Sequence, residues 1–532
     1  MIRLDVMHWI FHWVAVGTRL SPHLRRITLA PLLALSGWAG TAGTAQAADF
    51  AGWPSALKDI AQRQRIAPQQ VAMWVAPVDG GPDRLAIDVE TPRSVASVMK
   101  LFTTGTALQT LGPAYTWKTE VGLGGPLGTD GHVAGPIYVR GSGDPGLVLE
   151  RVQLMLSRWR AAGLHVIEGD WILDRSLFQL SPHDPAAFDG AALKPYNAGP
   201  DALLLNHRAL ILRFRPDDAL PQRVKVTLEP ELAEMEIVNR LKLHETAPCG
   251  DWREGITLSL EPDSHWHLTS TSQQRRWHVR LDGSYPKACL ERDWPLLWTG
   301  DHADDYAARL LTPMWRQLGG HLQGQVRSGT WPEGLPVWAR WTSPPLSQAV
   351  QDINKFSNNV MARQLFLTLG TFAPARPVTL PQAQTVVAEH VRAQTTSREG
   401  LSACAGDHLV LDNGSGLSRT ERSSARCLGE WMRALWRSPV MPEMLASLPI
   451  AGVDGTARRL NGASGKVHLK TGSLDGTSAI AGYAHADSGR RYVVIGVVNG
   501  QTDGARPLLD ALMSWAVQDT SAQASIPSAP TP

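Results

Sequence analysis

The chain has 532 residues, which is enough for two to four domains. Of these residues, 43% are hydrophobic and 19% are charged. Its 51 Lys and Arg against 49 Asp and Glu give a formal net charge of only +2 at pH 7. A charge this near to balance gives no reason to expect nucleic acid or an anionic membrane as the main partner.

The first pattern in chain order is an export signal. Arg25 and Arg26 precede an apolar run from Ile27 to about Gly37, and Ala45-Gln46-Ala47 offers a small-residue cleavage site before Ala48. This predicts a secretory signal peptide over residues 1–47. The run is shorter than the roughly 20 apolar residues of a spanning helix, so we expect a periplasmic protein without an integral membrane anchor.

Export also places the four cysteines in an oxidising compartment, which favours disulfides. None lies in a Cys-x-x-Cys pair, so zinc and thiol-redox sites are disfavoured. Three connectivities are open, and the local one, Cys249 with Cys289 and Cys404 with Cys427, closes the shortest loops. The histidines of the exported chain show no ligand spacing either, and we expect no metal and no cofactor.

Two strand-like runs, residues 71–75 and 85–89, form a predicted hairpin just before the first chemical motif. Ser97-Val98-Met99-Lys100 begins a predicted helix that ends at Gly112-Pro113, and the spacing puts Ser97 and Lys100 on one face. A lysine can take the proton of a serine if burial and neighbouring cations lower the pKa of its amine.

The interval that follows is far longer than one catalytic domain needs between its motifs. Strand-like runs there alternate with Gly, Pro and Asp turns, which indicates inserted β-rich structure. Gly141-Ser142-Gly143-Asp144-Pro145 lacks the Gly-Lys-Ser/Thr of a phosphate loop and is interpreted as a turn. The runs are Ile137–Arg140, Trp171–Leu173, Ala209–Leu212 and Val224–Val226.

Two further motifs follow the insertion. Ser357-Asn358-Asn359 lies on a predicted loop between helices at 344–353 and 360–369. Lys470-Thr471-Gly472-Ser473 closes a strand-like run, in which the period of two turns Lys470 away from Val467 and Leu469, toward a cleft. With the runs 478–486 and 492–498, this strand is expected to complete the sheet begun by the N-terminal hairpin.

In this order, the three motifs form the signature of the penicillin-recognising serine acyltransferases. With the segments 412–419 and 448–456, nearly all of the exported chain resembles the class C low-molecular-mass penicillin-binding proteins, the DacB-like D-alanyl-D-alanine carboxypeptidase/endopeptidases. The resemblance implies an α+β multidomain fold: a penicillin-binding/β-lactamase-like transpeptidase domain, with an antiparallel sheet flanked by helices, and nested, β-rich inserted domains. The expected division is 48–111 and 341–518 for the catalytic domain, 112–340 for the inserted domains, one nested in the other, and 519–532 for a disordered tail.

The same resemblance implies the chemistry. Ser97 would attack the carbonyl between the terminal D-alanines of a peptidoglycan stem peptide or cross-link, and β-lactams would acylate the same oxygen. Lys100 would accept its proton, and the Ser97 and Ser473 N–H groups would form the oxyanion hole. The other implied roles are proton relay for Ser357, acyl-amide binding for Asn359, and substrate binding by the Lys470, Thr471, Gly472 and Ser473 motif.

A specificity residue is also implied. In the family, an acidic residue on an inserted loop receives the free amine of diaminopimelate shortly before a segment that 196–203 resembles. Asp189 precedes this segment and is the candidate, although an Asp-Gly pair is also a common turn.

Two alternatives stay open, as does a homodimer. A class A β-lactamase needs Glu-x-x-x-Asn between the second and third motifs. None of Glu389, Glu399, Glu421, Glu430 or Glu443 has Asn four residues later. A non-catalytic cell-wall binding protein would keep the fold but would not turn over a D-Ala-D-Ala peptide.

Overall fold

The computed structural model describes residues 50–264, 274–300, 303–397, 399–500 and 502–519. The predicted signal peptide lies outside these ranges, as does the predicted tail apart from its first residue. That residue, Asp519, is buried and accepts hydrogen bonds from the hydroxyls of Tyr492 and Ser488. The last helix is therefore pinned to the turn between the final two strands.

A five-stranded antiparallel sheet joins the two ends of the chain. The predicted hairpin and the three predicted C-terminal strands all belong to it, so these predictions are confirmed. The strand that carries Lys470 lies at one edge and the hairpin at the other. In spatial order the strands are β2 (Leu85–Ile87), β1 (Val71–Pro77), β22 (Arg491–Asn499), β21 (Thr477–His485) and β20 (Val467–Leu474).

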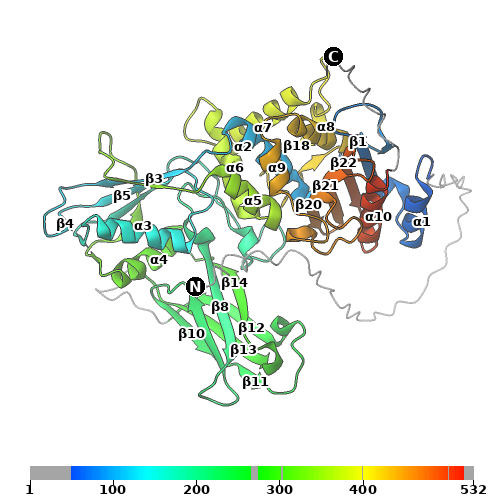
Figure 1. Ribbon diagram of the computed structural model, residues 1–532. Helices are drawn as coiled ribbons and strands as arrows, with labels where there is room; N and C mark the ends of the chain where they lie inside the picture. The colour runs from blue at the N-terminus through cyan, green and yellow to red at the C-terminus, as the bar shows by residue number, and fades with distance from the viewer. Residues whose placement is uncertain (1–49, 265–273, 301–302, 398, 501, 520–532) are drawn as a thin grey trace, which may run out of the picture.

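Helices cover both faces of this sheet (Figure 1). In β22, Val494 and Val498 pack into the core under α1 and α10, while Val493 and Ile495 pack into the core on the other face. This alternation follows from the period of two in a strand. One layer holds α1 (Ser55–Arg63) and α10 (Ala505–Val517); the other holds α2 (Lys100–Thr110), α5 (Leu346–Phe356), α6 (Asn359–Leu369), α7 (Leu380–Gln394), α8 (Ala425–Trp436) and α9 (Met441–Ser447).

The long interval after α2 folds into separate sheets that lie to one side of the five-stranded sheet (Figure 1). The first part is not purely β, in contrast to the predicted β-rich insertion: α3 (Leu149–Ala161) and α4 (Ala303–Gln317) pack their apolar faces on its sheets. Its strands are β16 (Val326–Ser328), β7 (Trp171–Asp174), β5 (Ile137–Arg140), β3 (Lys118–Leu123) and β17 (Ala339–Thr342), with β15 (His321–Leu322), β6 (Val166–Ile167) and β4 (His132–Val133) alongside.

A second, all-β part falls between β7 and β16 in the chain, and so is nested inside the first. The α+β multidomain class with nested insertions is therefore confirmed, and so are the four predicted strand runs of the interval. The nested strands are β8 (Ala209–Pro216), β9 (Val224–Glu229), β10 (Met235–Asn239), β11 (Lys242–His244), β12 (Ile256–Pro262), β13 (Trp277–Pro286) and β14 (Arg292–Leu297).

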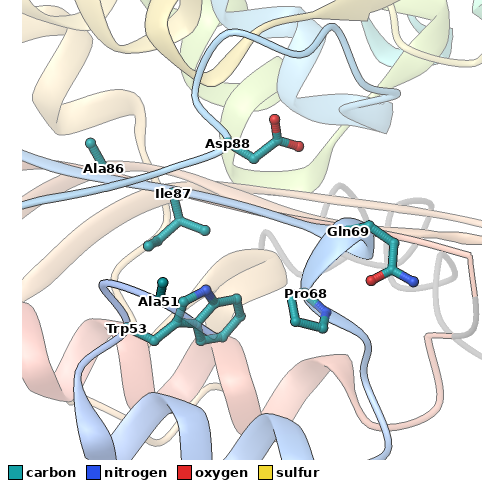
Figure 2. Close-up of a pocket in the computed structure, with 7 residues that line it drawn as sticks. All are labelled: Ala51, Trp53, Pro68, Gln69, Ala86, Ile87 and Asp88. Atoms are coloured by element: carbon teal, nitrogen blue, oxygen red, sulfur yellow. The ribbon is translucent and has the colours of Figure 1, made fainter. Parts of the chain in front are cut away.

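Both predicted disulfides are present, Cys249–Cys289 in the nested part and Cys404–Cys427 beside α8. Among the described residues, no helix has the length and apolar character needed to cross a membrane. A hollow of about 450 Å³ beside β2 is lined by residues such as Trp53, Ile87 and Asp88 (Figure 2). It lies at the sheet edge opposite to β20, away from the three motifs.

Candidate active site

Folding brings the three motifs together although they are far apart in sequence. Ser97 lies in a 3₁₀ turn, η3 (Ala96–Met99), that runs directly into α2, and Lys100 is the first residue of that helix. Ser357 ends α5 and Asn359 begins α6. Lys470 comes from the edge strand β20.

Lys100 is fully buried and is the centre of the site. Its Nζ lies 2.9 Å from Ser97 Oγ and donates to Asn359 Oδ1 at 2.5 Å. It also donates to the backbone carbonyl of Ser415, on a loop between β18 (Leu409–Val410) and β19 (Arg422–Ser423). The predicted pairing of Ser97 with Lys100 on one face is confirmed, and Asn359 joins it.

A second lysine contacts the second serine. Lys470 Nζ donates to Ser357 Oγ at 2.9 Å and to the Thr471 carbonyl at 2.7 Å. Ser357 has φ +60°, a left-handed conformation that ends α5, and Asn358 caps α6 by accepting from the Met361 N–H at 3.1 Å. The break between the helices is therefore a single tight turn, shorter than predicted. It directs the buried Ser357 Oγ toward β20.

Strand β20 passes against the turn that holds Ser97. A Cβ on Gly472 would lie 2.4 Å from the Val95 carbonyl oxygen, so only glycine permits this approach. The approach brings the backbone of the Lys-Thr-Gly-Ser motif beside the Ser97 N–H. The Thr471 hydroxyl bonds to the Thr456 hydroxyl at 2.7 Å, a contact with no counterpart in the predicted site.

Both lysines have amine pKa values below the ordinary range. Burial, the nearby charge of Lys470 and that of Arg363 lower the pKa of Lys100, and Glu421 opposes them. Burial lowers the pKa of Lys470 to about 7. Burial and a neighbouring cation thus act on the pKa of Lys100 in the predicted direction. A neutral amine beside a serine hydroxyl can activate that hydroxyl without histidine.

Asp189 lies outside this cluster, on a loop of the insertion. It is exposed and accepts hydrogen bonds from Tyr196 Oη at 2.6 Å, Asn197 Nδ2 at 2.9 Å and the Ala191 N–H at 3.0 Å. Burial raises the pKa of Asp189, but these bonds outweigh it, and the pKa is lowered. The carboxylate is thus ionised and held in one orientation.

The loop that carries Asp189 contacts two elements of the site. The Arg419 guanidinium lies 4.4 Å from the Phe188 ring centroid and donates to the Phe188 carbonyl at 3.3 Å. Arg363, on α6, donates to the Ala198 carbonyl at 3.2 Å. Asp189 therefore belongs to a loop that docks beside the motifs, although its carboxylate bonds to Tyr196, Asn197 and Ala191 and to no motif residue among the described ones.

The motifs do not reveal two further contributors, Ser415 and Glu421. Ser415 takes part through its carbonyl, and a backbone group leaves no residue-type signal. Glu421 fails the Glu-x-x-x-Asn spacing, yet it is buried close enough to affect the pKa of Lys100. Within the described ranges, no three His, Cys, Asp or Glu side chains form a group suited to a metal ion.

Comparison with known proteins agrees with this geometry. The model of the D-Ala-D-Ala carboxypeptidase 3 (S13) family matches residues 54–518. The D-alanyl-D-alanine carboxypeptidase of Actinomadura sp. (strain R39) is 30% identical over 78% of this chain and 74% of its own length. D-alanyl-D-alanine carboxypeptidase DacB of Haemophilus influenzae is 24% identical over 77% of this chain and 81% of its own.

The fold has a solved counterpart. Penicillin-binding protein 4 (dacB) from Haemophilus influenzae superposes with a TM-score of 0.68 at 20% identity, over 86% of this chain and 98% of that one. A structure of that protein in complex with a β-lactam gives a TM-score of 0.66 at 19% identity, over 87% of this chain and 99% of that one. Because the family model spans almost all of the described chain, this chain belongs to the D-Ala-D-Ala carboxypeptidase 3 (S13) family.

Proposed function

We propose that Ser97 is the nucleophile and Lys100 the general base of a serine D-Ala-D-Ala carboxypeptidase. The reaction class follows from the family, and one observation carries the assignment of residues. The Lys100 amine has three neighbours, Ser97 Oγ and the carbonyl oxygens of Asn359 and Ser415.

Two of these neighbours can only accept hydrogen bonds. A neutral amine has two N–H donors and one lone pair, so the two carbonyl oxygens take both donors. The lone pair is then left for the Ser97 hydroxyl, which can donate in return. The contact set therefore orients Lys100 to receive the Ser97 proton, and the lowered pKa keeps the amine ready to do so.

The proposed reaction has two halves. Ser97 Oγ bonds to the carbonyl carbon between the two terminal D-alanines while its proton passes to Lys100. The developing oxyanion is held by the N–H groups of Ser97 and Ser473. The C–N bond then breaks, D-alanine leaves with a proton relayed through Ser357, and water hydrolyses the ester on Ser97 to release the shortened peptide.

The remaining motif residues suit substrate binding. Lys470, Thr471 and Ser473 would hold the terminal carboxylate, because an amine and two hydroxyls that can donate hydrogen bonds lie on the same strand, while Asn359 would hold the acyl amide. Gly472 contributes the close passage of the strand. The same steps at a D-alanyl cross-link give endopeptidase activity, and a β-lactam would acylate Ser97 in place of the peptide.

We further propose that the protein works in the periplasm on peptidoglycan, as the N-terminal signal pattern and the substrate class suggest. No nucleic acid or cofactor takes part in the proposed reaction. The homodimer that the sequence allows would be detected by light scattering on the intact exported chain.

Intact mass spectrometry after incubation with benzylpenicillin tests the assignment. The wild type should gain one long-lived adduct, and Ser97→Ala should gain none while keeping its circular dichroism spectrum, since only a hydroxyl oxygen is removed. An adduct on Ser97→Ala would refute the nucleophile. A wild-type adduct that disappears rapidly would favour a β-lactamase, and labelling without turnover of a D-Ala-D-Ala peptide would favour a binding protein.

Asp189 is proposed as the receptor of the diaminopimelate amine. Its ionised carboxylate and the docking of its loop on Arg363 and Arg419 support this. Asp189→Asn should reduce kcat/KM for diaminopimelate peptides by about ten- to a hundredfold and leave penicillin acylation nearly unchanged, because penicillin lacks that amine. Equal losses for both ligands, or no loss, would remove Asp189 from the site.

A further inference from the structure

The loop that supplies the Ser415 carbonyl is folded around one buried carboxylate. Glu421 is only 4% exposed. Its Oε1 accepts the N–H groups of Asp412 at 3.1 Å and Gly414 at 2.6 Å, and its Oε2 accepts the N–H of Gly416 at 2.7 Å. Three N–H donors on the two oxygens stabilise the ionised form of the carboxyl group.

The carbonyls of the same loop point to α2. The Gly414 carbonyl accepts from Thr103 Oγ1 at 2.6 Å, and the Ser415 carbonyl accepts from Lys100. Three N–H groups of the loop thus bond to Glu421, and two of its carbonyls bond to the helix of the proposed base. A shift of the carboxylate would be passed to the Ser415 carbonyl through the peptide units that join them.

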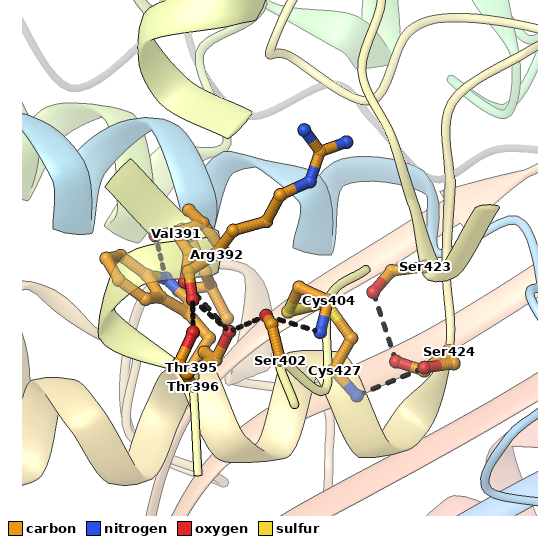
Figure 3. Close-up of a disulfide and its surroundings, with 11 residues drawn as sticks. Val391, Arg392, Thr395, Thr396, Ser402, Cys404, Ser423, Ser424 and Cys427 are labelled. Carbon is orange, nitrogen blue, oxygen red and sulfur yellow. Dashed lines mark hydrogen bonds between the residues drawn. A yellow bond between two sulfur atoms is a disulfide. The ribbon is translucent and has the colours of Figure 1, made fainter. Parts of the chain in front are cut away.

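The loop has almost no room to adjust. Gly414 and Gly416 have φ of +71° and +79°, which L side chains rarely adopt. A Cβ on Gly416 would lie 2.0 Å from the Ala96 carbonyl oxygen, next to the Ser97 turn. The strands β18 and β19 pair at the two ends of the loop, and outside them the Cys404–Cys427 disulfide joins the chain, with Ser424 capping α8 beside it (Figure 3).

Among the charges that affect the pKa of Lys100, the carboxylate of Glu421 acts in the opposite direction to the others. The cations that face Lys100 are Lys470 of β20 and Arg363 of α6, and Glu421 is the anion that opposes their effect. The pKa of Glu421 is raised, because burial, together with the nearby charge of Asp412, outweighs the three backbone N–H groups that lower it. Removing the negative charge would disfavour protonated Lys100, so the amine would stay neutral to lower pH.

We propose that Glu421 is a positioning residue for the acylation step: it holds the Ser415 carbonyl against Lys100 and so directs the lone pair of that amine to Ser97. The inference rests on the proposed roles of Ser97 and Lys100. Glu421 does not touch the substrate or the reacting atoms, and it acts through the backbone of residues 412–416.

Glu421→Gln tests it, because an amide NH₂ replaces the oxygen that accepts from Gly416 or from Asp412 and Gly414. The rate constant of acylation by a fluorescent penicillin would be measured over a pH series. We expect a loss of about 10- to 100-fold at the wild-type optimum. We also expect the acid limb of the profile, which reports protonation of the base, to move to lower pH. A purely structural role would lower the rate at every pH and leave the limb in place.

Asp510→Asn is the matched control. Asp510 also accepts backbone N–H bonds, from Asn461 at 3.1 Å and from Gly462, but it lies on α10 behind the sheet. This variant should match wild-type acylation at every pH. Equal effects in both variants, or an unchanged profile in Glu421→Gln, would overturn the inference.

Glu421→Asp covers the case in which Glu421→Gln does not fold. It keeps the charge and shortens the reach, so it should lower the rate with a smaller movement of the acid limb. If neither variant folds while Asp510→Asn does, Glu421 is a requirement of the fold and the inference is wrong. A wild type that is not acylated would instead refute the proposed function, so the two failures are distinguishable.

Discussion

The two faces of the five-stranded sheet are built on different principles. The face under α10 is closed by apolar side chains such as Leu509 and Val494. The face under α2 also buries Lys100, Lys470 and Asn354, each of which needs hydrogen-bond partners inside the protein. For example, Asn354 Nδ2 donates to Ser447 Oγ at 2.8 Å.

The difference separates stability from chemistry. Apolar burial on the α10 face stabilises the sheet without placing any reactive group. On the α2 face, burial makes a neutral amine available, because it lowers the pKa of Lys100. Substitutions on the α2 face should therefore lower mainly the rate of acylation, and substitutions on the α10 face should lower mainly the stability.

After removal of the proposed nucleophile itself, the largest effect on chemistry should come from Lys100→Met. It removes the proposed base, so penicillin acylation should fall by about 10²- to 10⁴-fold. Stopped-flow fluorescence with a labelled penicillin, together with a melting curve, would check it. A folded variant with a wild-type acylation rate would mean that another group accepts the Ser97 proton. The buried lysine of the α2 face would then not be the base.

Leu509→Ala should show the reverse. Leu509 is buried against the sheet, where a Cβ on Gly496 would lie 2.7 Å from its Cδ2. Removing its methyl groups should reduce the free energy of unfolding by about 2–5 kcal/mol in a denaturant titration. Acylation per folded molecule should not change. A large loss of acylation in the folded fraction would show that the two faces are coupled.

Lys470 should make stability depend on pH. Its amine has a pKa of about 7 in the fold against 10.5 as the ordinary value, so unfolding takes up a proton between these limits. The penalty for a buried ammonium is full below about pH 7 and is relieved as pH rises toward 10.5. Relative to that of Lys470→Met, the free energy of unfolding of the wild type should rise by on the order of a few kcal/mol across this pH window.

Denaturant titrations of both proteins at several pH values would show this trend. The comparison uses the pH dependence of the difference, because the loss of the bond to Ser357 changes the stability of Lys470→Met at every pH. A constant difference between pH 7 and pH 10.5 would mean that Lys470 titrates normally and is solvated or paired in the folded protein.

Thr456→Val should have the smallest effect. It removes the hydroxyl that bonds to Thr471 Oγ1 at 2.7 Å, and so frees a group proposed to bind the substrate carboxylate. The loss should be about 1 kcal/mol, or roughly fivefold in KM for a D-Ala-D-Ala peptide. The melting temperature should stay close to that of the wild type. An unchanged KM would exclude Thr456 from orienting Thr471.

Residue types at fixed spacing determined the motif part of the site. Ser97 with Lys100, Ser357 with Asn359, and Lys470 each carry a functional group on a side chain, so the sequence displays them directly. The strands of the central sheet were also predictable, because burial on both faces selects runs of β-branched and small apolar residues. Three disulfide connectivities were open in the sequence, and the structure shows the one that closes the shortest loops.

Only the tertiary structure decided what surrounds Lys100. The Ser415 carbonyl is a backbone group that every residue possesses, and 315 positions in sequence separate it from the amine. Glu421 has no spacing that marks it, because its partners are the N–H groups of a loop shaped by left-handed glycines. Sequence names the groups that can react, but their pKa and direction depend on burial and on neighbours that only the folded chain supplies.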